Sequence, residues 1–155
     1  MRISPQRRGR RLAASALEFA FVAPVFLLVL LGILEYARFL FTVQLMNNAA
    51  REGARYAVVS STTVSTSDVQ TYVDQYLAGQ GTAQLVGYSP STSITVYKAD
   101  ATTGQDSGQS WLNAGWGDAI GVTVSGTYEP LMPGLLWLSG SLTVQATCVM
   151  SSETN

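Results

Sequence analysis

Glu18 is the one charged side chain in an apolar stretch of 23 residues, from Leu12 to Leu34. A carboxylate in such a segment is costly to place in hydrocarbon, so it indicates a functional role. The chemistry open to it is pairing with a positive group, which offsets the cost of burying the charge. Glu18 could instead lie at the level of the lipid headgroups and be solvated there, and both alternatives stay open.

Few other side chains could carry catalysis or hold a metal ion. The chain has no histidine and a single cysteine, Cys148, which excludes histidine general bases and thiolate zinc sites. Asp100, Asp106 and Asp118 could offer oxygen ligands to calcium, but their spacing fits no EF-hand loop. The sequence also lacks a glycine-rich phosphate loop. We therefore expect no enzymatic activity, no cofactor and no metal site.

Residues 12–34 are long enough to cross a membrane. As a helix they extend about 34 Å, and a bilayer core is about 30 Å thick. A secretory signal peptide has a shorter apolar region and ends in a small-residue cleavage site, which Glu35–Arg38 does not offer. Basic residues favour the cytoplasmic side, and five arginines precede the stretch: Arg2, Arg7, Arg8, Arg10 and Arg11. The pattern predicts a single-pass protein of the cytoplasmic (inner) membrane, with the N-terminus in the cytoplasm and an extracytoplasmic head.

The charge of the remaining chain limits its partners. Residues 14–155 hold ten acidic and four basic residues, which argues against nucleic-acid binding, because that needs a basic face. The single cysteine excludes an internal disulfide. Cys148 is in phase with Leu142, Val144 and Ala146, so we expect a buried strand position rather than a reactive thiol.

The helix is expected to continue well beyond the apolar stretch, to about Val59, since the sequence from Glu35 contains no proline. Pro24 should bend it, because proline cannot donate its backbone hydrogen bond. Five small residues recur at spacings of three and four, and they could admit a second helix or simply seat this one on its own sheet: Ala49, Ala50, Gly53, Ala54 and Ala57. Glu52 and Arg55 are spaced to form an ion pair, within one helix or between subunits.

After the polar residues 60–67 the sequence predicts a short helix, capped by Ser67 and ended by Gly79. Residues then alternate with a period of two in three amphipathic strands, around 94–96, 120–124 and 142–148. A long loop joins the first two strands, and we expect Trp111 and Trp116 to anchor it by packing. The segment 129–140, with Pro130 and Pro133, is expected to cover the sheet or to touch a neighbour or the membrane surface.

The order of these features resembles the class III signal of type IV pilins and pseudopilins. In that family a prepilin peptidase removes a basic leader, and the glutamate becomes the fifth residue of the mature chain. Counting back from Glu18 places the cut between Ala13 and Ala14, with alanine where the family usually has glycine. The new amine on Ala14 could then pair with Glu18 of a neighbouring subunit.

Residues 14–59 also resemble the TadE-like family, which comprises minor pilins of the tight-adherence branch of type IV pili. The matching features are EFA at 18–20, Pro24, GILE at 32–35 and REGAR at 51–55. The resemblance implies a pilin-like α+β fold, in which a long N-terminal membrane helix packs on a small antiparallel sheet. Its parts would be a leader (1–13), the helix (14–59, membrane-spanning in its first half) and an α+β head (60–155).

The function implied is that of a non-enzymatic minor pilin or pseudopilin, incorporated into a pilus by helix packing and supporting pilus biogenesis and adhesion. Its expected partners are the membrane, a prepilin peptidase, other minor and major pilins and the inner-membrane assembly platform. The alternative is an uncleaved, single-span binding module that uses Trp111 and Trp116 as an aromatic platform.

Overall fold

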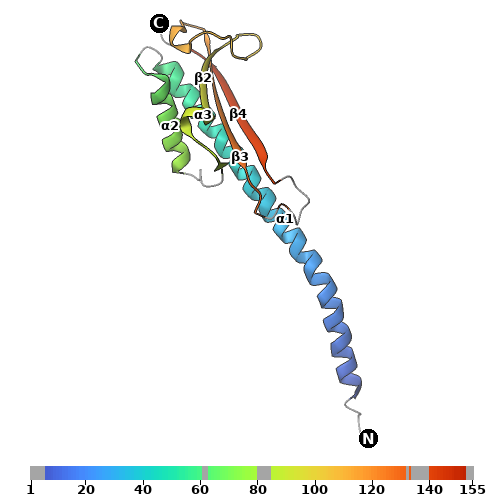
Figure 1. The fold of residues 1–155 in the computed structure, drawn as a ribbon. Coiled ribbons are helices and arrows are strands. Elements are labelled where there is room, and N and C mark those ends of the chain that lie inside the picture. The colour runs from blue at the N-terminus through green and yellow to red at the C-terminus, as the bar shows by residue number, and fades with distance from the viewer. Residues whose placement is uncertain (1–5, 61–62, 80–84, 132, 134–139, 153–155) are drawn as a thin grey trace. The chain divides into compact units, whose positions relative to one another are not determined.

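The structure, a computed structural model, describes residues 6–60, 63–79, 85–131, 133 and 140–152, with side chains from Ser15 onward. Its elements are α1 (Gln6–Val59), α2 (Thr66–Ala78), β1 (Leu85–Val86), α3 (Pro90–Ser93), β2 (Ile94–Ala99), the 3-10 turn η2 (Trp111–Asn113), β3 (Ala119–Tyr128) and β4 (Leu142–Ser151) (Figure 1). The chain divides into two compact units, Met1–Ala37 and Arg38–Asn155, which we call unit 1 and unit 2. Residues 38–59 of α1 therefore belong to unit 2.

In unit 1, α1 is a continuous helix that contains Pro24. Its apolar side chains face outward, and Phe19, Phe21 and Val25 are each more than 60% exposed. The helical segment Ser15–Val59 contains an 18-residue window of mean hydropathy 2.6, none of it buried. By length and composition this helix can cross a membrane.

In unit 2, β3 is the strand with which every other strand of the described sheet pairs, always antiparallel. One edge of β3 pairs with β2, from Ile94 opposite Val124 to Ala99 opposite Ala119, and with the short β1. The other edge pairs with β4 over ten residues, from Ala119 opposite Ser151 to Tyr128 opposite Leu142. The sheet thus has two faces, and alternate residues of each strand lie on each.

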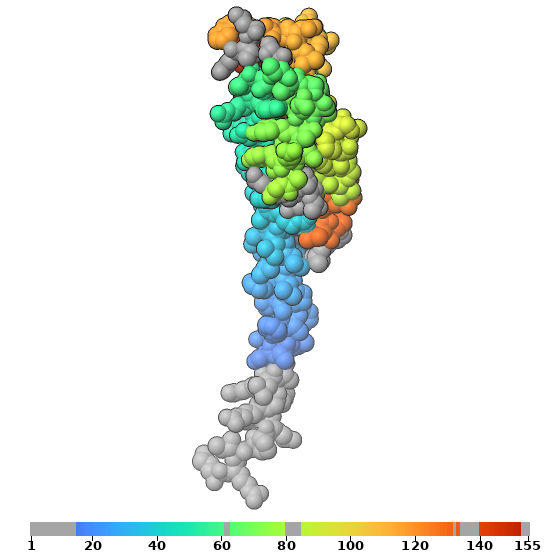
Figure 2. Space-filling view, turned by 90° about the vertical axis from the view of Figure 1, so that its left-hand side faces the viewer, coloured from blue at the N-terminus to red at the C-terminus, as the bar shows by residue number. Residues whose placement is uncertain are grey.

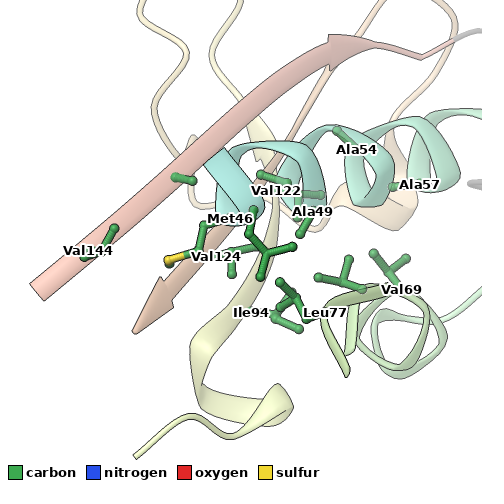
Figure 3. Packing of buried hydrophobic residues seen from close by; sticks show 14 of the residues in the cluster. Met46, Ala49, Ala54, Ala57, Val69, Leu77, Ile94, Val122, Val124 and Val144 are labelled. Atoms are coloured by element: carbon green, nitrogen blue, oxygen red, sulfur yellow. The ribbon is translucent and has the colours of Figure 1, made fainter. Parts of the chain in front are cut away.

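The core of unit 2 lies between α1, α2 and one face of the sheet. In Figure 3, side chains from all three converge. α2 contributes Val69, Val73 and Leu77, all with no exposed surface. The outer side of α2 is visible in Figure 2, in green, beside the yellow-green segment of α3. The predicted α+β fold, with a long helix packed on an antiparallel sheet, is confirmed.

Two local predictions were wrong. The N-cap of α2 is Ser65 rather than Ser67: its side chain accepts a hydrogen bond from the backbone of Asp68, whose carboxylate accepts from the N–H of Ser65. This reciprocal pair occupies two backbone donors that a helix start leaves free, so the cap lies two residues earlier. The sheet also has a fourth strand, β1, whose two residues are too few to show a period.

Candidate functional site

Glu18 lies in unit 1 with its side chain exposed. One turn further along α1 stand Phe21 and Val22, which are 73% and 64% exposed. The carboxylate therefore shares its side of the helix with apolar surface. Among the side chains that the structure describes, none forms an ion pair with Glu18. The side chains of Ala13 and Ala14, at the predicted cut, lie outside the described part, so the cut stays a prediction. The bend expected at Pro24 also stays a prediction.

The strip of small residues on α1 lies in unit 2 and is buried there. Ala49, Ala54 and Ala57 have no exposed surface. A Cβ added to Gly53 would lie 2.5 Å from Cγ2 of Val73 in α2 and 3.2 Å from Cγ1 of Val122 in β3. In the structure, the strip of small residues therefore packs against the sheet and α2 of the same chain.

No ion pair joins Glu52 to Arg55 in the described part of unit 2. Arg55 is exposed and Glu52 is half-buried. An exposed pair of this kind is worth less than about 1 kcal/mol, too little to hold two long side chains in one geometry. The block 51–55 thus contributes to the fold through Gly53 and Ala54, which are buried.

The two tryptophans of the long loop have different environments. Trp111 is 3% exposed, and its Nε1 donates a hydrogen bond of 2.9 Å to Oγ1 of Thr66 at the start of α2. Trp116 is 71% exposed. The expected anchor is therefore Trp111 alone. The aromatic platform of the binding-module alternative is wrong, because a buried Trp111 offers no ring face.

Asp100 and Asp118 of this loop form hydrogen bonds or ion pairs with nearby residues. Asp118 pairs with Lys98 at 2.6 Å, and the Lys98 ammonium and the backbone N–H of Gly115 hold the pKa of this carboxyl below its ordinary value. Asp100 accepts hydrogen bonds from the backbone of Thr102 and Thr103, which likewise lowers its pKa. The structure has no cluster of three potential metal ligands among its described residues.

Cys148 lies on β4, half-buried and packed against the core. Burial raises the pKa of its thiol, and the nearby positive charge of Arg51 opposes that shift. A raised pKa disfavours the reactive thiolate. Cys148 alternates in phase with Leu142, Val144 and Ala146 on the core side of β4, as predicted, and it is half-buried there.

The apolar run of the segment 129–140 falls largely on 132 and 134–139, outside the described residues. Of the other residues in this segment, Pro130 is buried and Leu131 is 72% exposed.

A comparison with protein families finds a match in the N-terminal region. A family model described as TadE-like protein matches residues 13–55. This region of the chain is TadE-like. The resemblance expected from the EFA, Pro24, GILE and REGAR features is confirmed over these residues. Residues 56–155 lie outside the match. Neither a curated protein nor a solved structure matches the chain.

The TadE-like region thus combines two parts with different surroundings. Its first part presents Glu18 and an exposed apolar surface in unit 1, while its last part, with Gly53 and Ala54, is buried in the core of unit 2. Sequence reasoning missed another feature, a concavity on the sheet face opposite α1, lined by Thr95, Tyr97, Thr123 and Thr147 among others. Alternation marks these positions as outward-facing, but only the strand register brings them together.

Proposed function

We propose that this protein is a minor pilin or pseudopilin of a tight-adherence pilus or of its assembly platform. The observation that carries the proposal is the TadE-like match over residues 13–55, which includes both Glu18 and the exposed apolar helix. A large exposed apolar surface of this kind marks a contact with lipid or with another protein. The bilayer would cover it before assembly, and helices of other pilins would do so afterwards.

The mechanism begins with removal of the basic leader. A prepilin peptidase cuts between Ala13 and Ala14 on the cytoplasmic side and creates a positive amine on Ala14. The helix then leaves the bilayer and packs laterally in a growing helical stack. Glu18 of one subunit pairs with the Ala14 amine of the next, and this pairing sets the axial register because a carboxylate in apolar surroundings is tolerated when it is paired.

The surface available for this packing is the apolar side of unit 1. The small residues of α1 from Ala49 to Ala57 are already covered by α2 and the sheet, so they contribute to the packing of unit 2. The residues available for contact with other pilins are exposed ones such as Phe19, Phe21 and Phe26, all more than 60% exposed. The proposed partners are the other minor and major pilins, the peptidase and the inner-membrane platform.

The position of the N-terminus tests this proposal. The protein is purified from membranes of cells with a working prepilin peptidase, and its N-terminal peptide is identified by mass spectrometry. We expect a chain that begins at Ala14. In cells without the peptidase the chain should keep residues 1–13, and Ala13→Phe should have the same effect by placing a bulky side chain before the cut. A chain that keeps the leader in peptidase-positive cells would instead favour the uncleaved single-span module.

A further inference from the structure

The outer face of the sheet, opposite α1, carries a concavity of about 580 Å³. This volume lies within the range of about 300 to 1,000 Å³ that is usual for small-molecule sites. Its floor comes from β2, β3 and β4, and its wall comes from residues 104–106 of the loop after β2. All of these residues belong to unit 2.

A row of three threonines crosses the floor. Thr95 of β2 lies opposite Thr123 of β3, and Thr123 lies opposite Thr147 of β4. Oγ1 of Thr123 and Oγ1 of Thr147 are 2.8 Å apart and share one hydrogen bond. Because each hydroxyl has one hydrogen and two lone pairs, the pair keeps one donor and several acceptor positions for a ligand.

The wall is held in place by backbone hydrogen bonds. The N–H of Asp100 donates to the carbonyl of Gln105 at 2.8 Å, and the N–H of Ser107 donates to the carbonyl of Lys98 at 2.9 Å. Gly104 adopts a φ of +71°, which lets the loop turn over the sheet. A wall fixed before binding lowers the entropy cost of holding a ligand.

Tyr97 supplies an aromatic ring at one side of the concavity. The ring lies on Gly121 of β3, where an added Cβ would clash with ring atoms, and the Tyr97 hydroxyl donates to the carbonyl of Gly104 at 3.4 Å. The missing side chain at Gly121 therefore leaves the space that the ring occupies. Such a ring offers an apolar contact next to polar groups.

The remaining lining groups have unused hydrogen-bonding capacity. The side-chain amides of Gln105 and Gln145 make no hydrogen bond within the described chain, and Asp106 uses Oδ1 to accept from the N–H of Gly108. The lining contains one carboxylate and no lysine or arginine. An anionic ligand would therefore meet repulsion without a compensating charge, whereas a neutral ligand rich in hydroxyl groups would find donors and acceptors on three strands and the loop.

We infer that this concavity binds a neutral saccharide. Its hydroxyl groups would bond to the threonine row, the two glutamines and Asp106, and its C–H surface would contact Tyr97. The site lies beyond the TadE-like segment and beyond the proposed role in pilus assembly. Binding needs neither leader cleavage nor incorporation, so the inference and the proposed function can fail separately.

The test is saccharide binding by the full chain in lauryldimethylamine oxide, a detergent without a sugar headgroup. Saturation-transfer-difference NMR is recorded with millimolar lactose, maltotriose and N,N′-diacetylchitobiose, and with 3′-sialyllactose as the anionic counterpart of lactose. We expect transfer to at least one neutral saccharide and weaker or no transfer to sialyllactose. Titration of the best neutral saccharide then gives the dissociation constant.

Three threonine variants locate the binding. Thr95→Val and Thr147→Val remove exposed hydroxyls at the floor while keeping a β-branched side chain, and each should weaken binding about threefold to tenfold. Thr143→Val is the matched control, since Thr143 is exposed on the same face of β4 but does not line the concavity. It should bind like the wild type, and all three variants should keep the wild-type circular dichroism spectrum.

Three results would overturn the inference. The first is the absence of transfer to every neutral saccharide from a chain with the native spectrum. The second is equal affinity of wild type, Thr95→Val and Thr147→Val, which would place the contact elsewhere. The third is a preference for sialyllactose, which would contradict the charge argument.

Discussion

Gly53 of α1 faces Val73 of α2 so closely that a single added carbon would lie 2.5 Å from Cγ2 of Val73. Val122 of β3 closes the same space at 3.2 Å, and both valines have no exposed surface. At the glycine of the REGAR block, helix α1 therefore packs directly against both helix α2 and the sheet. Because glycine has no Cβ, it leaves the space that this close packing requires.

Gly53→Ala is expected to destabilise unit 2. Alanine gains up to about 1 kcal/mol over glycine in a helix, but overpacking a core costs roughly 1 to 3 kcal/mol, and here two buried valines from different elements would have to move. We expect a net loss of about 1 kcal/mol in the free energy of unfolding, measured by chemical denaturation of the full chain in detergent. Adding Val73→Ala should recover part of this loss, and a Gly53→Ala variant more stable than wild type would contradict the packing argument.

The two loop tryptophans give a matched pair of variants. Trp111→Ala removes a buried ring and its hydrogen bond to Thr66, so we expect a loss of about 3 to 5 kcal/mol. Trp116→Ala removes an exposed ring and should change stability by less than about 0.5 kcal/mol. Thermal unfolding followed by far-ultraviolet circular dichroism measures both. Equal effects of the two substitutions would mean that the loop is not anchored at Trp111.

The start of α2 allows a test between two neighbouring serines. Ser65→Ala removes the side chain that accepts from the N–H of Asp68, and loss of an N-cap costs about 1 kcal/mol. Ser67→Ala leaves that cap in place, so its effect should be clearly smaller. Urea denaturation of the two variants compares them directly, and the assignment of the cap fails if Ser67→Ala is the more damaging change.

Acid should destabilise unit 2 through its hydrogen-bonded carboxylates. The pKa values of Asp68, Asp100 and Asp118 lie below the ordinary value of 3.8. A carboxyl group of this kind contributes stability above its unfolded pKa and loses that contribution as the pH falls through its folded pKa. The melting temperature should therefore be steady from pH 7 to about pH 5 and fall below about pH 4.

Asp118→Asn isolates one part of this pH dependence. The variant keeps the size of the side chain but loses the charge that faces Lys98. Its melting temperature should lie below that of the wild type at neutral pH, and the gap should narrow below about pH 4 because the wild-type carboxyl group then takes up a proton. A gap that stays constant down to pH 2 would show that the charge of Asp118 has no part in it.

Glu18→Gln tests the proposed register pair. The substitution keeps the size of the side chain and removes its charge, so the protein should reach the membrane at wild-type levels but be lost from sheared pilus fractions. Glu129→Gln is the control, since Glu129 is an exposed carboxylate outside the TadE-like match. Immunoblots of membrane and pilus fractions compare the three proteins. Normal incorporation of Glu18→Gln would refute the pairing.

Much of the fold was predictable because its signals are local. Alternation located the three longer strands, since a half-buried strand must alternate, and the uninterrupted apolar and small residues predicted the long helix. The residues of the predicted core, such as Val69, Ile94 and Val122, are buried. The TadE-like segment was recognisable from four short features within residues 13–55.

What the sequence did not reveal depends on contacts between distant residues. Trp111 and Trp116 lie five residues apart in the same loop. The buried ring of Trp111 bonds to Thr66, 45 residues away, and this distant contact cannot be read from the loop sequence. The row formed by Thr95, Thr123 and Thr147 needs the register of two strand pairs. For the same reason the small-residue strip could not be assigned to its own head before α2 and the sheet were placed against it.

The central position of β3 has a consequence for biosynthesis. β1, β2 and β4 each pair with β3 and not with one another in the described sheet. Until the ribosome has added Ala119–Tyr128, the earlier strands β1 and β2 have made no ladder and carry open backbone groups. Premature pairing with a foreign strand is the hazard of that interval, and the hazard ends when β3 pairs with β1 and β2.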